Sequence, residues 1–158
     1  MARSLAGTSP AGELLLAEPS DKPVVTLHVE DDAQVSEWMS TLLGAAGDVT
    51  LSATDGAGAM ALLADPAVRP DVLIVDYHLP GDMDGTDTAE AVSRRLGYAV
   101  PTILLSADLN NAVLPWMPGA PLCMLRKGAD PQLLLRVVHA FARLGRFMQS
   151  ARGPSARR

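Results

Sequence analysis

Three carboxylates, one hydroxyl and one amine come directly after short apolar runs of this sequence, and together they could do phosphoryl chemistry. They are Glu30, Asp31, Asp76, Ser106 and Lys127. Neighbouring carboxylates repel one another unless a cation joins them, and a set of ligands made only of oxygen favours a hard ion such as Mg²⁺. A carboxylate can form an acyl phosphate, while a hydroxyl and an ammonium group bind phosphoryl oxygens. These residue types therefore indicate Mg²⁺-assisted phosphoryl transfer to a carboxylate.

The elements that must position these residues are strands alternating with helices. The apolar run that ends at Asp76 has no polar face, which is typical of a parallel strand buried on both sides. The pattern predicts strands over 24–29, 49–53, 71–76, 102–105 and 122–125 and helices over 35–43, 57–63, 86–96 and 131–147. Such alternation demands a parallel sheet covered on both faces. We expect an α/β fold, a flavodoxin-like (βα)5 doubly wound five-stranded parallel sheet with strand order 2-1-3-4-5.

Open sheets of this kind bind ligands beyond the carboxyl ends of their strands. The strand that ends at residue 29 delivers Glu30 and Asp31, and the third strand delivers Asp76. The fourth and fifth strands deliver Ser106 and Lys127. The sequence therefore predicts that all five residues lie at one edge of the sheet.

This arrangement resembles the response-regulator receiver family of two-component signalling, over about residues 22–146. Asp76, four residues before Pro80, looks like the phosphoacceptor of that family. Glu30 and Asp31 look like its acidic pair. The resemblance implies a metal site of Glu30, Asp31, Asp76 and the backbone carbonyl of His78, with Mg²⁺ as cofactor.

The same resemblance implies that Ser106 and Lys127 stabilise the phosphoryl group. It also implies a histidine kinase or phosphotransfer protein as partner, an unknown downstream protein as target, and a signalling domain rather than an enzyme that turns over a substrate. The chain departs from the family in several places. Met124 stands at the switch position where the family has an aromatic residue, Gly128 replaces a proline, and the loop from Asp76 to Gly85 is one residue longer.

The segment 108–121 is the weakest part of the pattern, because Pro115 and Pro118 remove backbone donors that a helix needs. We expect it to be irregular rather than a regular fourth helix. The composition predicts a disordered N-terminal tail over 1–22, a receiver domain over 23–148 and a basic flexible tail over 149–158. The chain has no room for a DNA-binding domain after the receiver, so we expect output through protein contacts by a monomer or weak dimer.

Composition and charge exclude other classes of protein. A single cysteine cannot form an internal disulfide, and the apolar runs are too short to span a bilayer, so we expect a cytoplasmic protein without membrane contact. Residues 1–125 carry a net charge of −12 and the rest a net charge of +7. Such asymmetry can indicate a nucleic-acid tail, but an acidic metal pocket followed by a basic solvated helix explains it better.

Two alternatives stay open at this point. The chain could be a pseudo-receiver, which serves as an interaction scaffold without productive phosphorylation. The stretch Asp82 to Thr86 resembles the signature of haloacid-dehalogenase phosphatases, although it follows a loop instead of a strand. His28 fits a core position, His139 lacks the helical bundle of a phosphotransfer histidine, and Asp32 fits a helix cap better than a metal ligand.

Overall fold

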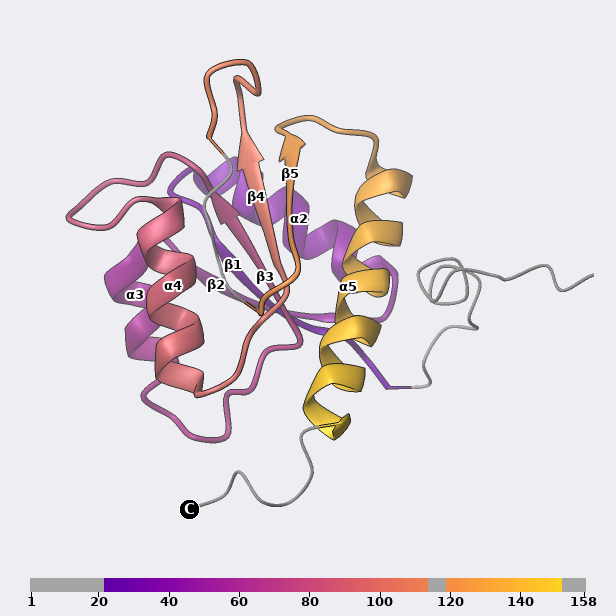
Figure 1. The fold of residues 1–158 in the computed structure, drawn as a ribbon. Helices are drawn as coiled ribbons and strands as arrows, with labels where there is room; N and C mark the ends of the chain where they lie inside the picture. Colours follow the sequence, from indigo (N-terminus) through magenta and orange to yellow (C-terminus); the bar gives the residue numbers. More distant parts are fainter. Residues whose placement is uncertain (1–21, 114–118, 152–158) are drawn as a thin grey trace, which may run out of the picture.

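The computed structural model describes residues 22–113 and 119–151 of the chain. Five parallel strands form one sheet in the order β2-β1-β3-β4-β5, so the predicted flavodoxin-like fold is confirmed (Figure 1). The strands are β1 (Val25–Val29), β2 (Val49–Ala53), β3 (Val72–Asp76), β4 (Thr102–Ser106) and β5 (Leu122–Arg126). The helices are α2 (Ala33–Ala45), α3 (Gly56–Leu62), α4 (Gly85–Leu96) and α5 (Pro131–Ala151).

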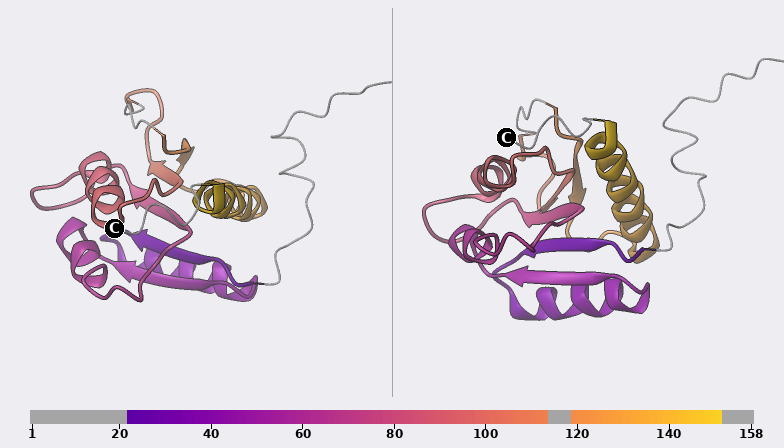
Figure 2. Two further views of the ribbon diagram at one scale, coloured as in Figure 1. Left: turned by 60° about the horizontal axis from the view of Figure 1, so that its bottom comes forward. Right: turned by 90° about the horizontal axis from the view of Figure 1, so that it is seen from below.

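The helices cover the sheet in two layers, with α3 and α4 on one face and α2 and α5 on the other (Figure 2). Every residue of β3 is buried, because this strand lies at the centre of the sheet and faces both layers. Its alternate residues supply two separate cores. Leu73 and Val75 pack beneath α3 and α4. Val72 and Ile74 pack beneath α2 and α5.

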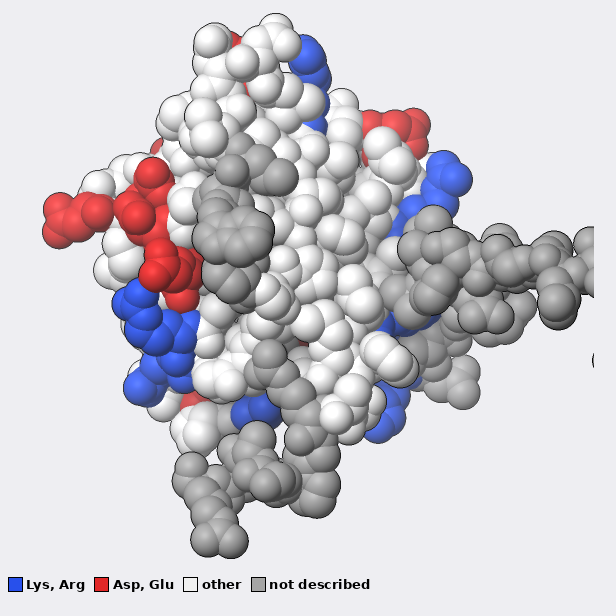
Figure 3. Space-filling model, viewed as in Figure 1, with Lys and Arg blue, Asp and Glu red and all other residues white. Residues whose placement is uncertain are grey.

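Acidic side chains cap the starts of the helices, as α2 and α4 illustrate. Asp32 accepts hydrogen bonds from the N–H groups of Gln34 and Val35, so it is the N-cap of α2, as its sequence position predicts. Asp84 and Asp87 form a reciprocal capping box at the start of α4. The acidic start and basic end of α4 complement the helix dipole, and Figure 3 shows this as red above blue on the left. The phosphatase-like stretch is therefore a helix start.

The connection between β4 and β5 contains no helix in its described parts, 107–113 and 119–121, as the prolines predict. Residues 114–118 of the predicted irregular segment lie outside the described residues. Two contacts hold the first part of this connection. The hydroxyl of Tyr77 accepts a hydrogen bond from the N–H of Val113 at 3.3 Å, and the carboxylate of Asp108 accepts one from the N–H of Asn110.

The final helix corrects one predicted boundary. Helix α5 continues to Ala151, three residues into the predicted flexible tail over 149–158. Gln149, Ser150 and Ala151 tolerate helical geometry, and the first helix-breaking residues are Gly153 and Pro154. Over the described part of the chain, no helix combines the length and the apolar character that crossing a membrane requires.

A histidine–aspartate contact and an ion pair attach α5 to the end of the sheet opposite the strand-end carboxylates. His139 Nε2 lies 2.5 Å from Asp48 Oδ2, and Asp48 also accepts a hydrogen bond from the N–H of Val24. Arg146 donates to both carboxylate oxygens of Asp71, at 2.8 and 3.1 Å. Each acidic residue thus joins α5 to a backbone position at the start of the sheet.

The lone cysteine allows a test of the packing of β5. Burial raises the pKa of the Cys123 thiol from 9.0 to about 11. Only the thiolate is nucleophilic, so a pKa two units higher lowers the reactive fraction about 100-fold. We expect maleimide to label Cys123 in the folded protein at least tenfold more slowly at pH 8 than in urea. Equal rates in buffer and in urea would contradict this packing.

Candidate functional site

The three carboxylates meet at the carboxyl edge of the sheet. Glu30 and Asp31 follow β1 directly, and Asp76 is the last residue of β3, the strand beside β1. Oxygen atoms of the three side chains all lie within 4.8 Å of one another. Glu30 and Asp76 are buried, whereas Asp31 is exposed at the mouth of the cluster. The structure therefore brings together the acidic residues that strand-end reasoning predicts.

Lys127 reaches into this cluster from the residue after β5. Its Nζ atom lies 2.6 Å from Asp76 Oδ2 and 3.1 Å from Glu30 Oε2. Burial disfavours the charge of Lys127, but the hydrogen bonds to Asp76 and Glu30 outweigh that cost and raise its pKa above the ordinary value. One ammonium group thus compensates two buried carboxylates.

Burial of Glu30 carries an electrostatic cost. Burial raises the pKa of its carboxyl, although the hydrogen bonds from the N–H of Asp32 and from Lys127 oppose that rise. The N–H of Asp32 donates to Glu30 Oε1 at 3.0 Å, which fixes the orientation of the carboxylate. A second cation at this edge would therefore be electrostatically favourable.

The end of β3 is held by the backbone around it. Asp76 Oδ1 accepts a hydrogen bond from the N–H of His78 at 3.1 Å, and the N–H of Gly85 donates to the carbonyl of Tyr77 at 3.1 Å. A Cβ atom on Gly85 would lie 2.1 Å from the carbonyl oxygen of Asp76, so only glycine fits there. The longer loop thus returns directly onto the strand end. Ligation of a metal by the carbonyl of His78 stays a prediction.

Ser106, the last residue of β4, is buried and is engaged with its own loop. Its hydroxyl donates to the carbonyl of Asp108 at 3.0 Å and accepts from the N–H of Asp108 at 3.2 Å. A contact with a phosphoryl group would require this hydroxyl to leave Asp108. Its predicted role stays a prediction.

The two departures near Lys127 take ordinary positions in the fold. Met124 lies beside Leu104 in the sheet and packs against the core beneath α3 and α4. Every peptide bond in the described part of the chain is trans, and Gly128 has a φ of +82°. That left-handed conformation suits glycine, because other residues strain there. The switch role of Met124 stays a prediction.

Sequence reasoning placed His28 in the core but missed how it lies there. Its ring is fully buried, and neither ring nitrogen has a hydrogen-bond partner among the described residues. Burial lowers the pKa of His28 to about 4, the positive charge of Lys127 adds to that effect, and Asp76 opposes it. The histidine is therefore neutral at physiological pH and adds no charge beneath the cluster. The position of His28 inside an otherwise apolar strand was the sequence signal for a buried, neutral histidine.

The fold and this pocket define the class: a flavodoxin-like α/β protein with an acidic cluster and a lysine at the carboxyl edge of its sheet. Comparison with protein families then identifies the family within this class. Residues 26–138 match the response regulator receiver domain. This chain therefore belongs to the response regulator receiver family of two-component systems.

Individual relatives agree with this assignment. The DNA-binding response regulator MtrA of Mycolicibacterium paratuberculosis is 34% identical over 113 residues, which cover 70% of this chain and 48% of MtrA. A response regulator receiver protein of Burkholderia phymatum is 32% identical with a TM-score of 0.60, covering 77% of this chain and 95% of that one. The N-terminal domain of a three-domain response regulator of Carboxydothermus hydrogenoformans is 26% identical with a TM-score of 0.67, covering 76% and 94%. The chain spans about half the length of the curated relatives it matches.

Proposed function

We propose that this receiver domain accepts a phosphoryl group on Asp76 from a histidine kinase or phosphotransfer protein, with Mg²⁺, and signals through protein contacts. The observation that carries the proposal is the position of Asp76. Its carboxylate ends a fully buried strand, lies 2.6 Å from the Lys127 ammonium group and shares a cluster with Glu30 and Asp31. Among the described carboxylates, Asp76 alone combines the last position of a strand with these neighbours.

The proposed transfer is a substitution at phosphorus. A carboxylate oxygen of Asp76 attacks the phosphorus atom of a phosphohistidine, the P–N bond breaks, and the imidazole nitrogen leaves with the electron pair. The product is an acyl phosphate on Asp76. Lys127 is placed to pair with a phosphoryl oxygen, because its ammonium group already touches the accepting carboxylate.

The residues of the cluster fit Mg²⁺. Their donors are all oxygen atoms, three carboxylates lie within 4.8 Å of one another, and one ammonium group leaves the cluster with excess negative charge. Glu30, Asp31 and Asp76 would hold the ion. Bound there, Mg²⁺ would neutralise the negative charge that a phosphoryl group brings.

A small phosphodonor tests the proposal without a kinase. Incubation with acetyl phosphate and Mg²⁺ is expected to add one phosphoryl mass to the intact protein, and the same incubation with EDTA is expected to add none. The acyl phosphate should be lost on brief exposure to hydroxylamine. An unchanged mass in the presence of Mg²⁺ would reject the proposal.

One observation favours the second candidate, a pseudo-receiver that acts as a scaffold. The hydroxyl of Ser106 is bound by Asp108 on both its donor and its acceptor side, so a phosphoryl group would have to compete with these contacts. The two candidates differ in one measurable result. A scaffold would bind Mg²⁺ and stay unlabelled by acetyl phosphate.

Asp31 is expected to be a metal ligand, and its replacement tests the metal site. We expect Asp31→Ala to weaken Mg²⁺ binding at least tenfold, about 1.4 kcal/mol, because the cluster loses its exposed carboxylate. Calorimetric titration with MgCl₂ measures the effect. Asp32→Ala is the matched control: it removes an acidic neighbour that caps α2, so it should cost about 1 kcal/mol of stability and leave Mg²⁺ affinity almost unchanged. Equal effects of the two variants would place the metal elsewhere.

We further propose a cytoplasmic location and output through protein contacts. Support for the location comes from the lone Cys123, which has no second cysteine for a disulfide. Support for output through protein contacts comes from Trp38, which is 44% exposed and lines a hollow beside Lys127 together with Val35 and Leu134.

A further inference from the structure

Strand β2 is an edge of the sheet, with β1 on one side only. The N–H of Val49 donates to Val24, and the carbonyl of Ala53 accepts from Glu30, so the residues with odd numbers in β2 face β1. Backbone groups alternate in direction along a strand of a parallel ladder. Thr50 and Ser52 therefore direct their N–H and C=O groups outward, away from the sheet.

This edge lacks the features that protect most exposed edges from pairing. Proteins blunt an edge strand with charged residues, proline or a bulge. The sequence of β2, Val-Thr-Leu-Ser-Ala, has no charge and no proline, and its five residues pair with β1 in continuous register. Val49 is 46% exposed and Ser52 is also exposed.

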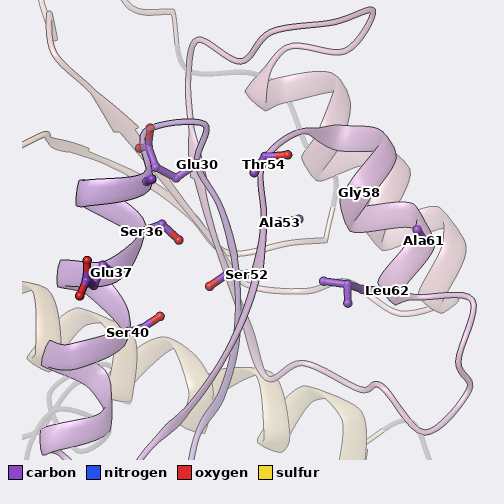
Figure 4. Close-up of a pocket in the computed structure, with 11 residues that line it drawn as sticks. Glu30, Ser36, Glu37, Ser40, Ser52, Ala53, Thr54, Gly58, Ala61 and Leu62 are labelled. Atoms are coloured by element: carbon purple, nitrogen blue, oxygen red, sulfur yellow. The ribbon is translucent and has the colours of Figure 1, made fainter.

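A groove runs along this edge between α2 and α3, with a volume of about 670 Å³. Figure 4 shows β2 as its floor, with Ser36 and Ser40 on the α2 side and Leu62 on the α3 side. Most side chains of the walls are small, so a backbone could come close to Ser52. The groove thus lies along the outward backbone groups of Thr50 and Ser52, where strand addition forms its main-chain hydrogen bonds.

The negative charge around the groove indicates which kind of partner could bind there. Residues 23–68, which form β1, α2, β2 and α3, contain seven acidic residues and no lysine or arginine. Glu37 lies on the groove itself and Asp55 flanks one end of β2, whereas Asp48 at the other end is already bonded to His139 and Val24. Nucleic acid would be repelled by this charge, and so would a second copy of the same acidic surface. A cationic segment would be attracted.

We propose that an extended, basic peptide segment of a partner protein binds the β2 edge by strand addition. Its backbone pairs with Thr50 and Ser52, and its lysine or arginine side chains pair with the surrounding carboxylates, Glu37 first among them. This surface meets the carboxylate cluster at Glu30, which lines the groove, but it does not include Asp76 and does not depend on phosphorylation.

The probe is a fluorescein-labelled synthetic peptide that alternates arginine and valine, titrated into the full chain without a phosphodonor. We expect saturable binding, with the amide signals of Thr50 and Ser52 shifted and protected from hydrogen exchange. A peptide with glutamate in place of arginine should not bind. Because no phosphodonor is present, failure here leaves the assignment of Asp76 untouched, and failure of labelling leaves this surface untouched.

Two pairs of variants separate backbone pairing from general attraction. Ser52→Pro removes one outward N–H and leaves the bonds to β1 intact, so affinity should fall about tenfold, whereas Ser52→Ala keeps the N–H and should bind normally. Glu37→Lys should weaken binding about fivefold, while the same charge change at exposed Glu90 on α4 should have little effect. The Glu37 and Glu90 pair decides the question if Ser52→Pro fails to fold.

Three results would overturn the proposal. Amide shifts that miss Thr50 and Ser52 would place the peptide elsewhere. A dimer of the unliganded protein that Ser52→Pro dissociates would make a second copy the occupant. Shifts of Thr50 and Ser52 on deletion of residues 152–158, with no peptide present, would assign the groove to the chain's own basic end.

Discussion

Replacing Asp76 with asparagine is expected to abolish labelling by acetyl phosphate completely. Asparagine keeps the size of the side chain but removes the anionic oxygen that attacks phosphorus. It also leaves Lys127, 2.6 Å from the original carboxylate, with Glu30 as its remaining acidic partner. Intact mass after incubation with Mg²⁺ and acetyl phosphate measures the loss.

Asp82→Asn is the control for that experiment. Asp82 lies in the same loop between β3 and α4, is exposed, and is outside the carboxylate cluster. It should be labelled like the unmodified chain. Undiminished labelling of Asp76→Asn would refute the assignment, and labelling lost only in Asp82→Asn would restore the phosphatase interpretation.

Gly85→Ala is expected to destabilise the fold by about 3 kcal/mol, the upper range for one methyl group forced into a packed interior. The new Cβ would lie 2.1 Å from the carbonyl oxygen of Asp76 and 2.9 Å from the Cα of Tyr77. Both obstacles are backbone atoms, so relief requires α4 to move away from the end of β3. Urea unfolding measures the loss, and Mg²⁺ affinity should fall with it because Asp76 moves.

Gly44→Ala in α2 is the matched substitution in open space. A Cβ at Gly44 meets no atom within 4 Å, and alanine favours a helix more than glycine does. This variant should gain about 0.5 to 1 kcal/mol of stability. Equal stability changes in the two variants would show that close approach at Gly85 is not the cause.

The strands of the sheet could be predicted from the sequence, because short apolar runs bounded by polar residues are typical of buried parallel strands. The run before Asp76 is buried along its whole length, and the rule that ligands bind at the carboxyl ends of parallel strands places Glu30, Asp31 and Asp76 together. The N-cap role of Asp32 was equally readable, because the helical pattern starts immediately after it. Local chemistry and topology agree at these positions.

Other features depend on distances that no pattern in one sequence encodes. The pairing of Lys127 with Glu30 joins residues 97 positions apart, and the hydroxyl of Ser106 could equally have faced the carboxylates. The predicted tail boundary at residue 149 was wrong, because Gln149, Ser150 and Ala151 can all continue a helix and the basic composition of the tail does not end one. The close approach of Gly85 to the backbone of Asp76 could not be predicted from the sequence, because a glycine at this position could equally indicate an ordinary turn.

Two polar side-chain contacts fix the later turns of α5 to the sheet, while its first two turns lack such a contact among the described residues. His139 and Arg146 tie the helix from residue 139 onward to Asp48 and Asp71, at the end of the sheet away from Asp76. Its first turn follows Lys127 by only a few residues. We therefore expect a displacement that starts at Lys127 to be largest in the first two turns of α5 and to decrease before it reaches His139. Partners that sense the state of the pocket would need to touch the beginning of this helix, and partners of its far end would bind both states alike.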